Sequence, residues 1–239
     1  MDTVVSGFAS AFRMISAGNP ELLKILFLSL KVSGLALVLA TLLGVPAAAA
    51  VALRRLPWRS LFLGLMHTGM GLPPVVVGLF LYLLLSRSGP LGFLELLYTP
   101  SAMILAQFIL TVPIVVSLAH AAMVGVDPVV RLAALTLGAT PLQEAATIIH
   151  EARYGIMAGV TAAFGRVMAE VGAVLMVGGN IAHYTRVMTT TIALETDKGN
   201  FDLAIALGVI LLGISLAINL GLRGLQRLGR VESGVILWD

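Results

Sequence analysis

Residues 127–153 read DPVVRLAALTLGATPLQEAATIIHEAR, and this segment decides the fold because it separates two long apolar runs. Asp127, followed by a proline, predicts a helix start, since Asp caps a helix and Pro suits its first position. Gly138 predicts the end of that helix. Thr140 and Gln143 have the spacing of a capping box, which predicts a second helix. Neither predicted helix is long enough to cross a bilayer.

The rest of the chain is apolar enough to predict a membrane protein. Of its 239 residues 59% are hydrophobic and 11% are charged, and the mean hydropathy is +1.01, which excludes an ordinary soluble domain. A transmembrane helix needs roughly 20 residues with few charges. Four uncharged intervals are long enough: Val32–Leu53, Ser60–Ser86, Leu96–Val126 and Leu203–Leu222.

A fifth interval, Tyr154 to about Ile181, is equally apolar but contains Arg166 and Glu170. Because these residues are four apart, they lie on one helix face and are expected to pair, a structural role. Gly155 and Gly159 also lie one helical turn apart, a spacing of small residues that permits the close approach of another helix. The sequence thus predicts an all-α membrane protein with about five transmembrane helices.

The short connections between these intervals predict the orientation. Eight Lys and Arg residues fall on one side of the membrane and three on the other. If the N-terminus lies on the side with three, Arg13, Lys24 and Lys31 add to that side. The side with eight is expected to be cytoplasmic, so the N-terminus is outside and the C-terminus inside. The eight are Arg54, Arg55, Arg59, Arg131, Arg153, Arg223, Arg227 and Arg230.

Three regions follow from this arrangement. We expect residues 1–31 to form an N-terminal interfacial segment, 32–222 the transmembrane domain, and 223–239 a cytoplasmic tail. If Val4–Gly18 also spans the membrane, there are six helices and the N-terminus moves inside. The basic residues lie between apolar runs rather than among aromatic residues, so nucleic acid is not an expected partner.

The predicted helical hairpin, residues 127–153, carries charges that place it outside the hydrocarbon. Its first helix presents Leu132, Ala133, Ala134 and Leu137, a surface that suits the groove of another protein. The alternative is an amphipathic connection that rests on the bilayer.

This hairpin resembles the EAA loop of ABC-importer permease subunits. The resemblance is carried by Ala133 and Ala134, by Gly138 after three residues, and by Ile148 after nine more; Leu132 replaces the family's Glu. His-Glu replaces the Leu-Pro pair that ends the family pattern. The resemblance implies a type I importer core in the inner membrane, working as a homodimer. It also implies a coupling helix that contacts separate ATPase subunits, and an extracytoplasmic binding protein.

Other stretches resemble permeases for oxyanions. Residues 71–79, GLPPVVVGL, and the segments 170–173 (EVGA) and 178–181 (GGNI) are similar to molybdate and tungstate permeases. Residues 189–201, TTTIALETDKGNF, look most like the tungstate branch. The resemblance implies tungstate as the carried ion, with molybdate and sulfate as alternatives.

Pro73 and Pro74 lie within the second apolar interval, where two prolines break the helix ladder. Broken helices near the middle of the membrane are frequent in transport pathways. The alternative is that the prolines only kink the helix for packing.

A polar group is expected near the outer ends of the fourth and fifth spans. We interpret these residues as an outer gate, with Arg186 and Lys198 attracting anions, whereas the alternative is that they cap loops. The residues are Asn180, Thr189, Thr190 and Thr191.

The sequence has no phosphate-binding Gly-rich loop and no metal-ligand spacing. We therefore expect the chain to be non-catalytic and to bind no cofactor, with ATP and Mg²⁺ used by the partner ATPase. A secondary transporter remains an alternative, although no convincing internal repeat supports it. A membrane enzyme is a third, but Glu170 is the only clear mid-span acid.

Overall fold

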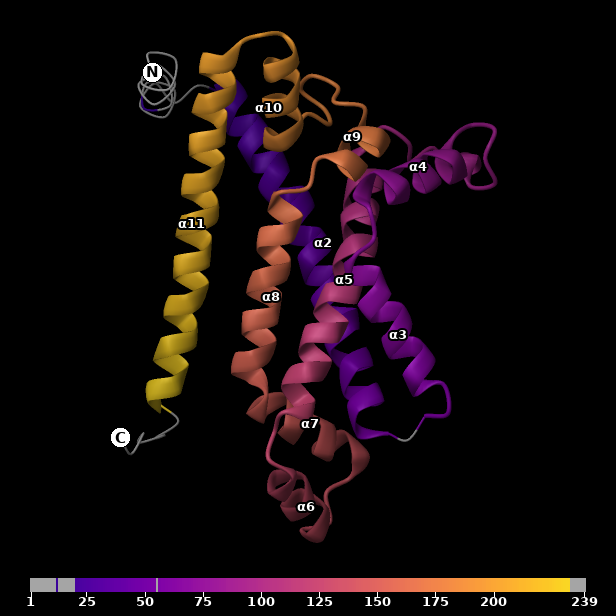
Figure 1. Cartoon of the computed structure of the whole chain (residues 1–239), viewed down its shortest axis with the longest axis vertical. Helices are drawn as coiled ribbons and strands as arrows, with labels where there is room; N and C mark the ends of the chain where they lie inside the picture. The colour runs from indigo at the N-terminus through magenta and orange to yellow at the C-terminus, as the bar shows by residue number, and fades with distance from the viewer. Residues whose placement is uncertain (1–11, 13–19, 55, 233–239) are drawn as a thin grey trace. The chain divides into compact units, whose positions relative to one another are not determined.

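The computed structural model describes residues 12, 20–54 and 56–232, and its regular elements there are all helices (Figure 1). The predicted all-α fold is confirmed. The segment Val4–Gly18, apart from Phe12, and residues 233–239 lie outside the described residues. The α-helices are α2 (Pro20–Leu53), α3 (Arg59–Met70), α4 (Pro74–Leu85), α5 (Pro100–Val124), α6 (Pro128–Thr136), α7 (Pro141–Glu151), α8 (Arg153–Met168), α9 (Gly172–Gly178), α10 (Met188–Asp197) and α11 (Phe201–Glu232). A short 3₁₀ helix, η1, covers Gly92–Leu94.

Among the described residues, α2, α5 and the part of α11 up to Leu222 are each long and apolar enough to cross a membrane. Two helix pairs, α3 with α4 and α8 with α9, also pass this test but are bent by more than 40° at a short break. Counting each pair as one span gives five, in agreement with the predicted number. The helix boundaries differ from the predicted intervals, most of all at α2, which begins at Pro20 rather than Val32.

The two breaks have different sequence causes. Pro73 has φ −65° and ψ 120°, and Pro74 is the first residue of α4, so the predicted interruption at the prolines is confirmed. The second break falls at residues 169–171, where Glu170 lies between α8 and α9. That break was not predicted, since the fifth interval contains no proline.

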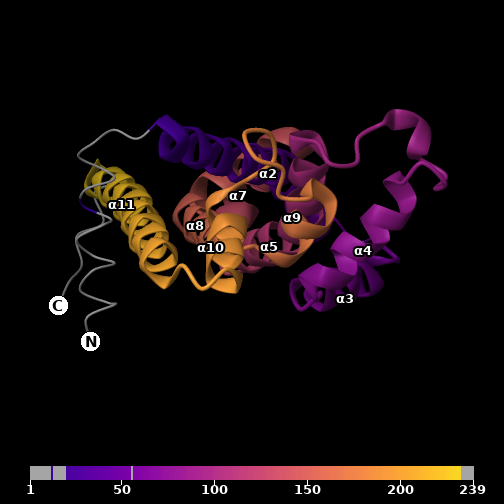
Figure 2. The same ribbon diagram turned by 90° about the horizontal axis from the view of Figure 1, so that it is seen from above.

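The chain divides into two compact units, and the first comprises residues 1–38, 72–111 and 164–216. In its described part α9 packs directly on α4: a Cβ atom at Gly78 would lie 2.9 Å from Ala173 Cα, and one at Gly172 would lie 2.7 Å from Val75 Cγ2. Both views show α9 beside α5 as well (Figures 1 and 2). The buried core comes mainly from α4, α5 and α9: Val77, Leu81, Leu85, Ala102, Met103, Ala106, Leu110, Ala173, Val174 and Val177.

The second unit comprises residues 39–71, 112–163 and 217–239. The predicted close contact at Gly155 and Gly159 is confirmed, because added Cβ atoms would lie 2.7 Å from Ala122 Cβ and 2.8 Å from Leu118 Cβ. The core of this unit also includes residues of α2, α5 and α7: Ala48, Ala49, Val116, Ala119, Met123 and Ile148. It is the base on which the hairpin of α6 and α7 rests.

Candidate functional site

The hairpin of α6 and α7 has the local structure that its sequence predicts. Asp127 caps α6 by accepting a hydrogen bond from the backbone N–H of Val129 at 2.9 Å. Gly138 connects the helices at φ +81°, a left-handed conformation that other residues rarely adopt. Thr140 and Gln143 form the predicted capping box, in which Gln143 Oε1 accepts from the Thr140 backbone N–H at 2.8 Å.

Arg131 links the two helices of the hairpin to each other and links the hairpin to the rest of the second unit. Arg131 Nε donates to Glu144 Oε1 at 2.6 Å, which links α6 to α7. Its Nη2 donates to the backbone oxygen of Leu53, the last residue of α2, at 2.8 Å. The position of the hairpin is therefore fixed by directed bonds as well as by packing.

The outer face of the hairpin is apolar and exposed. Leu137 is 88% exposed and Leu142 is 81% exposed, and both flank the turn at Gly138. An open groove runs along this face, lined in part by Ala133, Ala134 and Gly138. Leu132 is also exposed. Exposed apolar side chains outside the candidate spans suit either a protein partner or the surface of the bilayer, the two alternatives that the sequence leaves open.

Ile148 differs from the other residues predicted to contact the ATPase. It is only 3% exposed and packs in the core of the second unit. Its position anchors α7 rather than offering a contact. Leu142 contributes more to the exposed face, although sequence reasoning missed it. The signal that was available is its position directly after the proline that begins α7.

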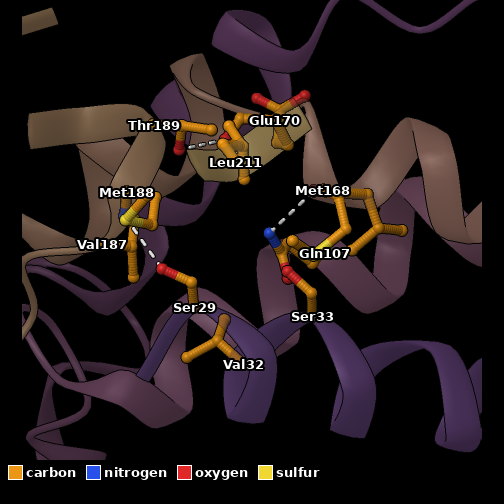
Figure 3. A pocket seen from close by; sticks show the side chains of 11 residues that line it. Ser29, Val32, Ser33, Gln107, Met168, Glu170, Val187, Met188, Thr189 and Leu211 are labelled. Carbon is orange, nitrogen blue, oxygen red and sulfur yellow. Dashed lines mark hydrogen bonds between the residues drawn. The ribbon is translucent and has the colours of Figure 1, made fainter. Parts of the chain in front are cut away.

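A small polar cavity lies inside the first unit (Figure 3). The space is about 10 Å³, at the lower limit for one water molecule, so the four oxygens of a tetrahedral oxyanion do not fit. Its lining comes from α2, α5, α8, α11 and the start of α10: Ser29, Val32, Ser33, Gln107, Val167, Met168, Glu170, Val187, Met188, Thr189 and Leu211.

Gln107, which lines this cavity, is buried, with 4% of its surface exposed. Its Nε2 donates to the backbone oxygen of Val167 at 3.3 Å, and its Oε1 has no partner among the described residues. On the opposite side Ser29 Oγ accepts from the backbone N–H of Met188 at 2.8 Å (Figure 3). These bonds join α5 to α8 and α2 to the start of α10 around the cavity.

Glu170 has the structural role that was predicted for it. The predicted pair is present, with Arg166 Nη1 donating to Oε2 at 3.3 Å. Its Oε1 accepts from the backbone N–H of Ala173 at 2.9 Å, which caps the start of α9. The carboxylate is 4% exposed and fully engaged, and it would repel an anion.

The predicted gate residues separate into two groups. Thr189 borders the cavity and donates to the backbone oxygen of Glu170 at 2.9 Å. Thr190 instead caps the start of α10, and Thr191 and Asn180 form hydrogen bonds beside this cap. Thr190 is 1% exposed, and its hydroxyl accepts from the Val187 N–H at 3.1 Å. The structure therefore favours the capping alternative for these three residues.

Thr190 also reaches Asn180, and its hydroxyl donates to Asn180 Oδ1 at 3.0 Å. Thr191, likewise buried, donates to the Val187 backbone oxygen at 2.7 Å. Because these hydroxyls are occupied and enclosed, they are not available to a passing ion.

Lys198 was expected to attract anions, but its charge is balanced. Its Nζ donates to Glu195 Oε1 at 2.8 Å, and Asn200 Nδ2 donates to Oε2 at 2.8 Å. The hydrogen bond from Lys198, followed by that from Asn200, lowers the pKa of the Glu195 carboxyl, so Glu195 stays ionised near neutral pH. Lys198 therefore adds little positive potential.

Neither candidate site contains the donor set of a metal centre. Within the described ranges, no group of three or more His, Cys, Asp or Glu side chains is placed to hold a metal ion.

Apolar helices that could form five spans, two of them broken, and an exposed hairpin outside them accord with a membrane-embedded transporter permease. The chain belongs to the family of binding-protein-dependent transport system inner membrane components, whose sequence pattern matches residues 40–228. It is thus a non-catalytic, multi-pass inner-membrane subunit of an ABC transporter.

Individual relatives agree with this assignment. The chain is 47% identical over 203 residues to a probable anion ABC transporter permease protein of Haloferax volcanii, covering 83% of this chain and 88% of the relative. It is 38% identical over 226 residues to the tungstate uptake system permease protein TupB of Peptoclostridium acidaminophilum, covering 95% and 99%. Permeases named for sulfate and molybdenum match at lower identity.

A solved structure supports the fold alone. The crystal structure of a bacterial ABC transporter involved in the import of the acidic polysaccharide alginate matches with a TM-score of 0.72 at 18% identity, covering 87% of this chain and 80% of that chain.

Proposed function

We propose that this chain is the permease subunit of an importer for tungstate, a tetrahedral oxyanion. The observation that carries the proposal is the likeness, almost from end to end, to a permease named for tungstate uptake. The segment 189–201, which forms α10 and the turn after it, resembles the same branch. Molybdate and sulfate are the alternative cargoes.

The hairpin of α6 and α7 is the proposed coupling element. In this proposal two copies of the chain form a homodimer, and each hairpin lies in a cleft of one ATPase subunit. The exposed Leu137 and Leu142 support this role, since exposed apolar patches mark sites of protein–protein contact. ATP and Mg²⁺ are bound by the ATPase, and this chain binds no cofactor.

The orientation follows from the distribution of basic residues. With the N-terminus outside and the C-terminus inside, the hairpin faces the cytoplasm, where ATP is available. An extracytoplasmic binding protein delivers the oxyanion from the other side. ATP-driven closure of the ATPase subunits moves the hairpins and switches the pathway between two states, a rigid-body transition.

ATP hydrolysis by the assembled transporter tests the proposal. Binding protein loaded with tungstate should stimulate hydrolysis more than binding protein loaded with molybdate or sulfate, because only the correctly filled binding protein favours closure. Equal stimulation by empty binding protein would contradict the substrate assignment.

The role of the hairpin is tested by Leu137→Asn, with Thr136→Asn as the matched control. Both residues are exposed neighbours on the hairpin, but only the first change removes apolar surface. We expect L137N to weaken co-purification of the ATPase by about ten-fold, as loss of an apolar anchor does, and T136N to leave it within about two-fold. Wild-type association of L137N would contradict a docking role for this face.

A further inference from the structure

The first unit contains a second cavity, of about 210 Å³, between the first turns of α2 and the residues that precede α10. One water molecule in the liquid has a share of about 30 Å³, so this cavity has room for a small ion together with water. Its polar lining consists of Glu21, Lys24, His183, Tyr184 and Arg186.

Arg186 has a buried donor that lacks an acceptor. Its Nη2 donates to the backbone oxygen of Asn180 at 3.4 Å, which holds the guanidinium against the loop. Its Nε is enclosed and has no hydrogen-bond partner among the described residues. Because this atom is enclosed, it is out of reach of a ligand in the cavity, to which Arg186 contributes its positive charge.

The charges around the cavity also favour an anion. Among the described residues that line it, Lys24 and Arg186 carry two positive charges against one negative charge on Glu21, a net charge of one positive. Glu21 already has an interaction within the structure. In the described part of the chain Lys24 forms no ion pair, in contrast to Lys198, whose charge is taken by Glu195.

The loop beside the cavity has an unusual backbone. His183 has φ +63° and Asn180 has φ +50°, and both lie in the left-handed region. Such conformations cost free energy in residues other than glycine, and they concentrate at functional sites. His183 and Tyr184 line the same cavity as the two cations.

We propose that Lys24, His183, Tyr184 and Arg186 bind a tetrahedral oxyanion at a site distinct from the polar cavity at Glu170. All four side chains can donate hydrogen bonds to oxygen, and Lys24 and Arg186 add positive charge that favours an oxyanion. The ligand is either an inorganic oxyanion in solution or the phosphate of a lipid headgroup, since exposed Leu23 and Phe27 flank Lys24 on α2.

The test uses the full-length chain reconstituted in nanodiscs of phosphatidylcholine, alone or mixed with phosphatidylglycerol. Sodium tungstate and inorganic phosphate are the soluble probes, measured by equilibrium dialysis with elemental mass spectrometry. Lys24→Gln and Arg186→Gln should each weaken anion binding about ten-fold, because each removes a charged donor. Lys198→Gln, which removes an already neutralised cation, should change it less than two-fold.

The lipid mixture distinguishes the two sources of the oxyanion. If a headgroup is the ligand, phosphatidylglycerol should displace tungstate, and K24Q and R186Q should retain less of this lipid in native mass spectrometry. If the ligand is inorganic, the lipid should leave tungstate binding unchanged.

The proposal is overturned if K24Q and R186Q bind tungstate and phosphate and retain phosphatidylglycerol as the unaltered chain does. This assay needs neither the ATPase nor the binding protein. Failure of ATP-driven uptake would therefore leave its result standing, so the two outcomes are separable.

Discussion

Glu144 and Glu151 both lie on α7, but their surroundings differ. Glu144 is buried and accepts a hydrogen bond from Arg131 at 2.6 Å, whereas Glu151 is exposed at the end of the helix. The pair can therefore separate the effect of a linking contact from the effect of removing a charge.

Glu144→Gln should loosen the hairpin, because it replaces a charge-assisted bond by a weaker neutral one. The Arg131 side chain is 42% exposed, and solvent screening limits the expected loss to about 1 kcal/mol of local stability. Hydrogen exchange of the backbone amides in 128–151 should become about five-fold faster. Glu151→Gln should leave these rates unchanged. Equal rates in the two variants would show that the bond from Arg131 does not hold α6 to α7.

Thr190→Val should destabilise the protein rather than narrow a pathway. The valine leaves the Val187 N–H without its acceptor, at a cost of about 1–3 kcal/mol, whereas Thr190→Ser keeps the hydroxyl. Thermal denaturation of the purified chain should show a lower Tm for the valine variant only. Wild-type stability with reduced uptake in the valine variant would instead support the gate interpretation.

Residue-level roles were predictable from sequence only where both partners are close in the chain. Arg166 and Glu170 are one helical turn apart, so their pairing follows from helix geometry. The burial of Thr190 and Ile148 depends on which helices pack around them, and no local pattern contains that information. Lys198 is a different case, because its partner Glu195 is only three residues away and their pairing could have been predicted.

At the scale of the elements, the turn between α6 and α7 depends on one glycine. An added Cβ at Gly138 meets nothing within 4 Å, so any penalty comes from its φ of +81° and not from crowding. Gly138→Ala should weaken ATPase co-purification through strain of about 1–2 kcal/mol. Gly138→Asn should be milder, since Asn tolerates this conformation. A fully functional G138A would show that the turn geometry does not matter for docking.

The contact between α4 and α9 depends on close approach. Gly78→Ala would place its Cβ 2.9 Å from the backbone of Ala173, which cannot move without shifting α9. Overpacking of this kind costs about 1–3 kcal/mol, so the variant should lose thermal stability. Gly64→Ala on α3 is the matched control, because its Cβ meets nothing within 4 Å. Equal stability of the two variants would contradict direct α4–α9 packing.

The elements that sequence predicted well are those with strong end signals. The caps at Asp127 and Thr140 and the break at the two prolines all appear where expected. The break at Glu170 was missed because a carboxylate that caps a helix and a carboxylate that forms a buried ion pair look alike in the sequence. The early start of α2 was missed because Lys24 and Lys31 are exposed on the helix without ending it.

For the whole molecule, the main question is where an oxyanion passes. The cavity at Glu170 holds at most about one water molecule, and the nearby Thr190 and Thr191 are enclosed. This accords with a pathway built from two copies of the chain, as the proposed homodimer requires. Two dianions as alike as tungstate and molybdate differ too little in shape and charge for the sequence to separate them.

ATP-dependent uptake into proteoliposomes tests the central claim most directly. The chain is reconstituted with its ATPase and binding protein, and accumulated tungsten, molybdenum and sulfur are measured together by elemental mass spectrometry. We predict tungsten accumulation that requires ATP and persists in excess sulfate. Absence of ATP-dependent tungsten uptake, with the complex assembled and hydrolysing ATP, would contradict the proposed function.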